Sequence, residues 1–310
     1  MKYNYIFTND GIVDISLNTV FSYNQLILLT TKYIDSSFIS QYNPALYRAT
    51  IYQDYLYICL DGNLYKISNE CLTNGCLCEN DISLQLEYLD NRIGGLVIVD
   101  NKLYILETSF SRIRQYNIDS SGNIDKLSLY IPELYPKKYK LPYSTTYTTE
   151  LIVNYLLEAY STDNYKPLTK LLIDDGHPNK LICINSTESL DIIDINTWTV
   201  ESFPQNVLYI NNAIVSGNLI YYVSSNVIYA FSLDTLDLIG PILNCNIFGT
   251  DNYEYCNLWI RENTLHYSMR FIGENQDSKT IVFNIDINTY GYSMTQYSNM
   301  TVYSNIIDYS

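Results

Sequence analysis

The stretch LYICLDGNLYKIS, residues 56–68, contains two short apolar runs separated by Asp61 and Gly62. Asp-Gly between β-forming residues is a strong hairpin signal, because the tight type I′ turn requires positive φ at both of its central positions. The stretch therefore predicts two antiparallel strands. Whether it is one hairpin in an ordinary domain or one copy of a repeat depends on the rest of the chain.

Similar runs recur along the chain. The run before the turn is found again as NYIFTN, KLYILET, KLICIN, NLIYYVS and TLHYSMRF, and a further short apolar run precedes most copies, as in GGLVIVDNKLYIL. A run that ends in aliphatic-Asp-x-x-Thr follows in several copies, as in LDIIDINTWTV and TIVFNIDINTY. The unit is therefore four strands, repeated every ~40–50 residues, which is the period of β-propeller blades.

The repeat predicts an all-β fold, a β-propeller with four-stranded antiparallel blades in a single domain, residues 1–310. We count six units and keep seven as the alternative. The chain begins in what would be a second strand, NYIFTN, and ends in NMTVYSNIIDYS. We therefore expect a strand within Thr301–Asp308 to pair in the same sheet as Asn4–Thr8, because an open ring would leave two unpaired sheet edges.

One segment departs from the repeat. Residues 131–170 contain no hairpin signal, and Thr148, Thr149 and Glu150 precede the apolar run LIVNYLLEAY. A hydroxyl cap followed by an acidic first turn is typical of a helix start. We expect an insertion at 131–170 with one docked helix at about 148–160, unless the segment is a degenerate seventh blade.

The aliphatic-Asp-x-x-Thr turns between short strands resemble those of the YncE-like and quinoprotein-like propellers. The resemblance extends over about four-fifths of the chain and concerns architecture alone. Trp-Asp dipeptides and Ser-x-Asp-x-Gly-x-Thr-Trp boxes, which mark other propeller families, are absent, and a double glycine occurs once, at Gly94 and Gly95, rather than in every repeat. Because one fold serves many functions, the resemblance implies no activity and no cofactor.

The net charge of the chain restricts the classes of partner that it can bind. The chain has 33 acidic and 18 basic residues, a net charge of −15, and its densest basic stretch is the single loop 136–140. A polyanion would be repelled, so we expect no nucleic-acid partner. No apolar window approaches ~18 residues, so we expect no membrane insertion. The N-terminal residues do not form a secretory signal, which favours a cytoplasmic location or, given the composition, a virion of a large DNA virus.

The seven cysteines give one candidate metal loop. Cys71, Cys76 and Cys78 lie together in ECLTNGCLCEN, but no second pair with zinc-ligand spacing follows. A disulfide within this loop, or from Cys245 to Cys256, is a further alternative. Cys59 and Cys183 lie inside apolar runs and are expected to be buried thiols.

The two histidines give a second candidate. His177 follows Asp174 and Asp175 in one turn, a set that could hold a metal, although a polar connection between strands is the favoured interpretation. His266 is expected to lie in a strand with a hydrogen-bond partner, and Trp198 and Trp259 to pack in the core. No nucleotide-binding loop, nucleophile elbow or zinc-protease motif is present, so no catalytic residue is assigned.

Three function classes remain. The absent catalytic motifs, the inserted segment and a Tyr-rich, low-charge surface favour a non-enzymatic protein-interaction or structural propeller, because Tyr offers large contact area at low entropic cost. The alternatives are a metal-dependent hydrolase or lactonase at the mouth of a central channel, and a glycan-binding module.

Overall fold

The computed structural model describes the larger part of the chain. The described residues are 2–8, 11–14, 19–22, 25, 48–60, 62–68, 70–71, 82–90, 92–132, 134, 168–174, 176–185, 189–204, 210–224, 226–245, 253–272, 278–298 and 302–308. Within these ranges the secondary structure is β-strand, apart from short turns, a 3₁₀ turn at Thr108–Phe110 and isolated helical residues at Gln25, Glu70 and Cys71. The all-β prediction is confirmed.

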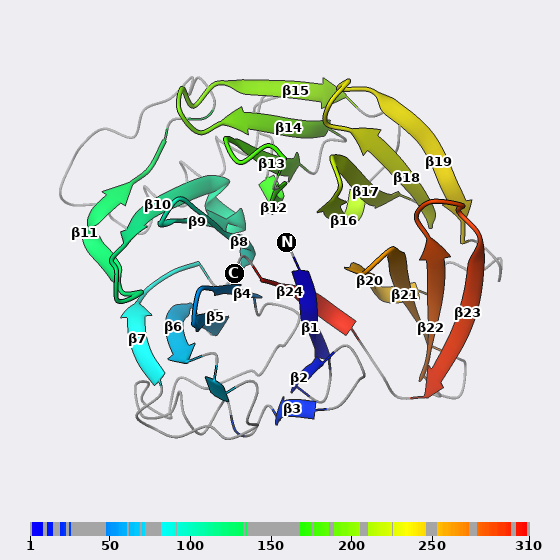
Figure 1. Ribbon diagram of the computed structural model, residues 1–310, viewed down its shortest axis with the longest axis horizontal. Coiled ribbons are helices and arrows are strands. Elements are labelled where there is room, and N and C mark those ends of the chain that lie inside the picture. Colours follow the sequence, from blue (N-terminus) through cyan, green and yellow to red (C-terminus); the bar gives the residue numbers. More distant parts are fainter. Residues whose placement is uncertain are drawn as a thin grey trace, which may run out of the picture.

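The strands form five sheets arranged around a common centre (Figure 1). The largest has eight strands in the order β3-β2-β1-β24-β4-β5-β6-β7. Its strands are β1 (Lys2–Thr8), β2 (Gly11–Asp14), β3 (Thr19–Ser22), β4 (Arg48–Tyr52), β5 (Tyr55–Leu60), β6 (Asn63–Ser68), β7 (Ile82–Leu86) and β24 (Val302–Asp308).

Each of the other four sheets is an antiparallel meander of four consecutive strands. The first two are β8 (Ile93–Val99), β9 (Lys102–Glu107), β10 (Arg112–Ile118) and β11 (Ile124–Tyr130), then β12 (Leu168–Ile173), β13 (Lys180–Asn185), β14 (Ser189–Asp194) and β15 (Val200–Pro204). The last two are β16 (Ile210–Ser216), β17 (Leu219–Ser224), β18 (Val227–Ser232) and β19 (Leu238–Asn244), then β20 (Tyr253–Arg261), β21 (Thr264–Ile272), β22 (Ser278–Asp286) and β23 (Tyr292–Ser298).

The number of separate sheets differs from the prediction. Neither six nor seven separate sheets form among the described residues, because β24 pairs in parallel with β4 and joins two four-stranded antiparallel groups into one sheet of eight. The parallel pairs are Ile306 with Ala49, Ile307 with Thr50 and Asp308 with Ile51. Period and turn chemistry indicate where strands form, but they do not indicate whether neighbouring edges come close enough to share hydrogen bonds.

Closure by the two ends of the chain is confirmed. β24 pairs antiparallel with β1, with Tyr5 opposite Ile306 and Phe7 opposite Ser304. Both ends of the chain therefore lie at the centre of the ring (Figure 1). The innermost strands contact one another in the order β24, β4, β8, β12, β16, β20 and back to β24, so the described inner strands form a closed circle.

The turns follow the predicted chemistry. The opening stretch forms the hairpin β5–β6, with Leu60 opposite Asn63 and a φ of 75° at Gly62. In the Asp-x-x-Thr turns the carboxylate of Asp194 accepts from the backbone N–H of Asn196 at 2.8 Å and of Thr197 at 3.0 Å. These hydrogen bonds hold the pKa of Asp194 below its ordinary value.

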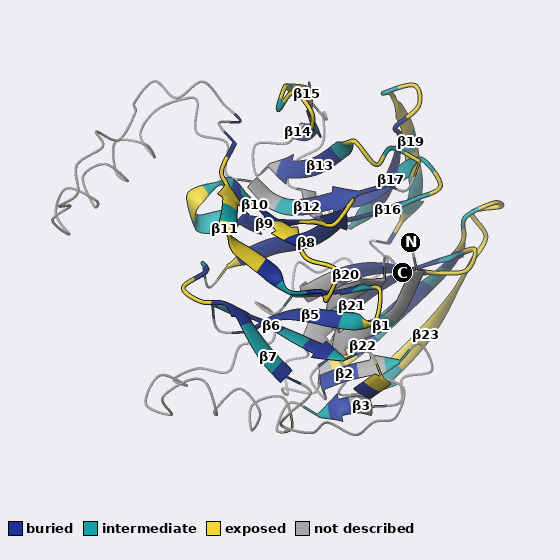
Figure 2. Ribbon diagram, turned by 60° about the vertical axis from the view of Figure 1, so that its left-hand side comes forward, coloured by how far each residue is buried: buried dark blue, intermediate teal, exposed yellow. Residues whose placement is uncertain are grey.

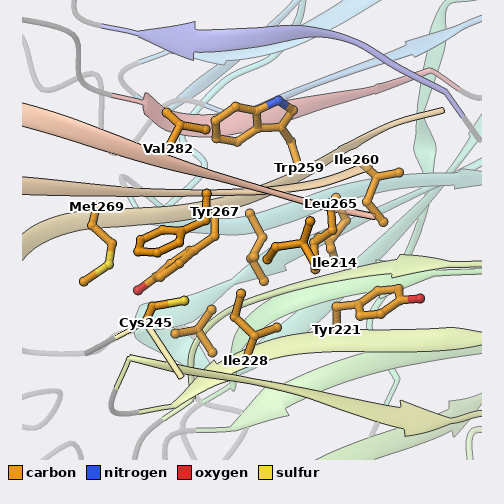
Figure 3. Close-up of a cluster of buried hydrophobic side chains, with 14 of the residues drawn as sticks. Ile214, Tyr221, Ile228, Cys245, Trp259, Ile260, Leu265, Tyr267, Met269 and Val282 are labelled. Carbon is orange, nitrogen blue, oxygen red and sulfur yellow. The ribbon is translucent and has the colours of Figure 1, made fainter. Parts of the chain in front are cut away.

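The core lies between successive four-stranded groups. Strands are buried on both faces near the centre and exposed toward the rim (Figure 2). Figure 3 shows one such layer, in which Ile214, Tyr221 and Ile228 of β16–β18 lie on the same side as Leu265 and Tyr267 of β21. This two-sided burial is the reason that the inner strands are near-continuous apolar runs.

Only the two ends of the predicted insertion lie within the described residues. Ile131, Pro132 and Leu134 are described, and β12 begins at Leu168 rather than after residue 170. The predicted helix at about 148–160 lies outside the described residues.

Candidate functional site on the inner strands

Four inner strands share a local irregularity. On β8, β12, β16 and β20 the pairing with the second strand of the sheet shifts by one residue near the start of the strand. β24 has the same shift against β1, between the pairs at Thr8 and Phe7. Such bulges redirect side chains and recur beside functional sites.

The shifts place one residue of each inner strand at an equivalent level. On β8, β16 and β20 the first residue after the shift lies five pairs from the hairpin turn, and the first residue of β4 also lies five pairs from its turn. We call these positions the inner ring; its members are Arg48, Gly95, Lys170, Asn212, Asn257 and, on β24, Ser304.

Side-chain contacts confirm that the ring positions face one another. The Lys170 amino group donates a short hydrogen bond to Oδ1 of Asn212, which also accepts from the backbone N–H of Ala213 at 2.8 Å. The Asn212 amide in turn donates a short hydrogen bond to Oδ1 of Asn257. Three neighbouring inner strands are thus linked through side chains at one level.

The ring contains two cations. Burial, reinforced by the positive charge of Arg48, lowers the pKa of Lys170 to about 7. Burial also lowers the pKa of Arg48 to about 10. Because like charges disfavour each other's ionised forms, the two side chains destabilise each other. A divalent cation would meet the same repulsion here, so the described part of the ring is unsuited to the metal-dependent hydrolase alternative.

A second buried charge cluster lies on β9 and β10. Glu107 is 0% exposed and accepts a hydrogen bond from Nε of Arg114 at 2.8 Å and a short one from Nε of Arg112. It also accepts from the backbone N–H of Asp90 at 3.0 Å. Its charge is compensated within the sheet, which is the pattern of a structural ion cluster.

The structure brings together two of the three residues proposed at the histidine turn. Nδ1 of His177 lies 3.1 Å from Oδ2 of Asp174, and Asp175 lies outside the described residues. Nε2 of His177 lies 3.5 Å from Oδ1 of Asp234, which the next sheet contributes. The imidazole thus bridges two sheets. Among the described residues, no group of three or more His, Cys, Asp or Glu is placed to hold a metal ion.

Only one end of the cysteine loop lies within the described residues. Cys71 is a buried thiol, whereas Cys76 and Cys78 lie outside the described residues. Cys245 is also a buried thiol, which corrects the suggested bridge from Cys245 to Cys256. Cys59 and Cys183 are buried thiols as predicted, and burial raises the pKa of Cys183.

The aromatic predictions are largely confirmed. His266 lies in β21, donates a 2.7 Å hydrogen bond from Nδ1 to Oδ1 of Asn284 and stacks on Trp259 at 5.1 Å between ring centroids. Trp198 packs on Tyr104 and Tyr130 as a core residue, but it lies in a turn with φ of 57°, not in a strand.

An apolar strip lies at the rim. β11 is the outermost strand of its sheet, and Leu127, Leu129 and the following Ile131 are 97%, 43% and 43% exposed. Leu127 and Leu129 lie where the pairing of β11 with β10 is irregular, between the pairs at Asp125 and Tyr130, and Ile131 follows the end of the strand. Tyr130, between Leu129 and Ile131, is 47% exposed, and its ring lies 5.7 Å from that of Trp198.

The comparisons with known proteins concern the fold alone. No family model and no curated protein matches the chain. A solved structure of apo AztD from Citrobacter koseri matches with a TM-score of 0.50 and 8% identity, over 84% of this chain and 73% of that one. This chain is a β-propeller. The propeller resemblance inferred from the repeats is therefore confirmed at the level of architecture.

Two further structures are similar. The N-terminal domain of Nup159 matches with a TM-score of 0.49 and 10% identity, over 82% of this chain and 61% of that one. A complex of S. cerevisiae dbp5 with nup159 and gle1 matches with a TM-score of 0.48 and 10% identity, again over 82% and 61%. The propeller thus spans less than two thirds of the Nup159 chains.

No helix in the described ranges is long and apolar enough to cross a membrane. The inner ring itself was missed by the sequence analysis. Arg48 and Lys170 carry no motif, and Asn is so common in this chain that Asn212 and Asn257 do not stand out. A register-based alignment of the repeats would have placed all four in one column.

Proposed function

We propose that this propeller is a non-enzymatic interaction module that binds a protein partner along the outer edge of the β8–β11 sheet. The observation that carries the proposal is the apolar strip of Leu127, Leu129 and Ile131 on β11. Monomeric proteins normally protect an edge strand with charge, proline or a bulge, because its unpaired backbone groups can pair with another chain. Here β11 has a bulge between Asp125 and Tyr130, yet Leu127 and Leu129 within it remain exposed.

The partner that fits is an extended segment of another protein that adds a strand to β11. Backbone hydrogen bonds would supply affinity, and alternating apolar side chains of the segment would cover Leu127 and Leu129. The neighbouring side of β11 is anchored on Trp198 through Tyr130, so the edge is supported by the next sheet.

The test is site-specific photo-crosslinking in cells that express the native protein. We expect a crosslinker at position 127 to give one adduct of defined mass, and one at Met294, which is 51% exposed on the rim strand β23, to give none. Leu127→Asp with Leu129→Asp should abolish recovery of that partner without lowering Tm. Recovery of the protein alone, with no adduct, would overturn the proposal.

We also infer that the eight-stranded sheet counts as two blades, which makes the propeller six-bladed. The support is that its two halves pack face to face like separate blades, with Ile12 and Phe21 of one half against Leu56 and Tyr65 of the other. The halves contribute β24 and β4 to the circle of inner strands in the same way as the other sheets contribute one strand each.

We also propose a cytoplasmic or virion location, for which the support is the composition of the chain. Immunogold labelling of cells that produce the protein would distinguish the two locations from each other and from secretion.

A further inference from the structure

Two loops at one end of the β8–β11 sheet are fastened together. The carboxylate of Asp90, in the loop between β7 and β8, accepts from the backbone N–H of Ser109 at 2.7 Å and from its hydroxyl at 3.0 Å. The carbonyl oxygen of Arg92 accepts from the backbone N–H of Thr108 at 2.9 Å and from its hydroxyl at 2.7 Å. The turn between β9 and β10 is therefore held in place by a second loop.

A phenyl ring lies at the exposed tip of that turn. Phe110 is 52% exposed, and the guanidinium carbon of Arg112 lies 4.5 Å from the centre of its ring. At this distance a cation is attracted to the face of an aromatic ring. The ring is thus fixed beside a charged group while half of the residue still meets solvent.

A buried carboxylate fixes the orientation of Arg112. Its Nε donates a short hydrogen bond to Oε2 of Glu107, which is 0% exposed. A guanidinium has five N–H donors. Within the described ranges Arg112 makes no other hydrogen bond, and its side chain is 32% exposed. The donors of its two terminal nitrogens are therefore left for a ligand.

The second arginine on the same carboxylate differs in both respects. Nε of Arg114 donates to Oε2 of Glu107 at 2.8 Å, and its Nη1 donates to the hydroxyl of Tyr116 at 3.3 Å. Its side chain is only 15% exposed. Arg114 thus completes the sheet, whereas Arg112 shares the carboxylate and presents its outer edge to solvent.

We propose that Arg112 and Phe110 bind a short acidic segment of a protein partner. One carboxylate of the segment pairs with the terminal N–H groups of Arg112, because the planar guanidinium matches the two oxygens of a carboxylate. An apolar side chain of the same segment packs on Phe110, since arginine and aromatic side chains supply much of the energy of protein interfaces. The net charge of −15 opposes a long polyanion but permits contact with a single guanidinium.

This contact goes beyond the edge proposed on β11. It uses the turn at one end of the same sheet and requires neither Leu127 nor Leu129. A partner held at both places would gain affinity from each of them.

The test uses two seven-residue peptides that carry the same neutral dye. In one peptide glutamate alternates with phenylalanine, and in the other glutamine replaces each glutamate. Fluorescence anisotropy at pH 7 measures their binding to the full chain. We expect the acidic peptide to bind about tenfold more tightly, and Arg112→Gln to remove that preference. Arg261→Gln makes the same change at an exposed arginine of β20 and should leave binding unchanged.

A second variant keeps the test decisive if Arg112→Gln folds poorly. Phe110→Ala leaves the Glu107 cluster intact and should weaken binding of the acidic peptide about tenfold. Leu127→Ser with Leu129→Ser should leave it unchanged, which separates this site from the edge on β11. The proposal is overturned if the two peptides bind alike or not at all, or if folded Arg112→Gln or Phe110→Ala binds the acidic peptide as the wild type does.

Discussion

Protonation of Lys170 is linked to folding because its pKa falls to about 7 in the folded protein, below its ordinary value of 10.5. Between these two values the unfolded chain binds more protons at this residue than the folded chain does. The free energy of unfolding therefore rises with pH across that interval, and burial of the charged amine is most unfavourable at the acidic end. The groups that face Lys170 in the described structure are Arg48 and the amide of Asn212.

We expect Lys170→Met to stabilise the protein most at pH 6 and progressively less toward pH 9, in buffers free of phosphate and carboxylates. Methionine fills similar volume without a charge, so the variant lacks the proton linkage. Urea unfolding of both proteins at pH 6, 7, 8 and 9 measures the difference. Lys102→Met is the control and should show no such trend; an equal effect at every pH would contradict the linkage.

Three turns place a bulky residue in left-handed backbone conformation. Trp198, Leu236 and Tyr290 have φ of 57°, 59° and 57°, each four residues after the Asp or Ser that begins its turn. The backbone N–H of Tyr290 donates to the carbonyl oxygen of Asp286 at 2.8 Å, which fixes the strained residue. The repeat pattern identified the Asp and the Thr of these turns but not the residue that adopts positive φ.

Tyr290→Gly is expected to stabilise the propeller by up to about 1 kcal/mol, because an L-residue pays roughly that amount in this conformation and glycine does not. Part of the gain is offset by the greater freedom of glycine in the unfolded chain. Chemical unfolding measures the change. Tyr292→Gly, two residues later in β23, is the matched control and should destabilise; destabilisation by both variants alike would exclude the strain argument.

At the scale of elements, the hairpins could be predicted from the sequence, whereas the register of the inner strands could not. The positive φ of Gly62 and the local hydrogen bonds of the Asp-x-x-Thr turns depend on adjacent residues, so short windows predict these turns. The one-residue shifts at Gly95, Lys170 and Asn212 depend on how each inner strand meets its neighbours around the axis. No local signal encodes them, which is why the candidate site was not foreseen.

The hairpin of β9 and β10 depends on Glu107. Glu107→Ala should lower the free energy of unfolding by about 3 kcal/mol, because Arg112 and Arg114 would be left without their shared carboxylate. Urea unfolding at pH 7 measures the loss. Glu201→Ala, an exposed glutamate on β15, is the control and should change stability by less than about 0.5 kcal/mol. If Glu107→Ala lowered the free energy of unfolding as little as Glu201→Ala does, the ion cluster would not be needed for stability.

At the scale of the whole molecule, ring closure was predicted correctly from the two ends of the sequence, and the count of separate sheets was not. Closure follows from a general requirement, since apolar strands at an open seam would be exposed. The two four-stranded groups join into one sheet because β24 and β4 lie close enough at the axis to share hydrogen bonds. The distance between these two strands is determined only by the assembled ring.

Deletion of residues 299–310 should destabilise the entire propeller, because it removes β24 and with it the partner of both β1 and β4. We expect a loss of more than about 3 kcal/mol, seen as a drop in Tm of roughly 6 °C or more and as aggregation through the exposed edges. A truncated protein that stays soluble and melts within about two degrees of the full chain would disprove the closure argument.

The antiparallel pairing of β1 with β24 has a mechanical consequence. Lys2 lies opposite Asp308, so the two ends of this chain leave the fold side by side. Tension applied between them would load the ladder at one end and break its hydrogen bonds one after another, like a zipper. Tension applied between two rim strands would instead be shared across several sheets. A molecule held by its two ends would therefore open under weak pulling, whereas one held by its rim would bear load.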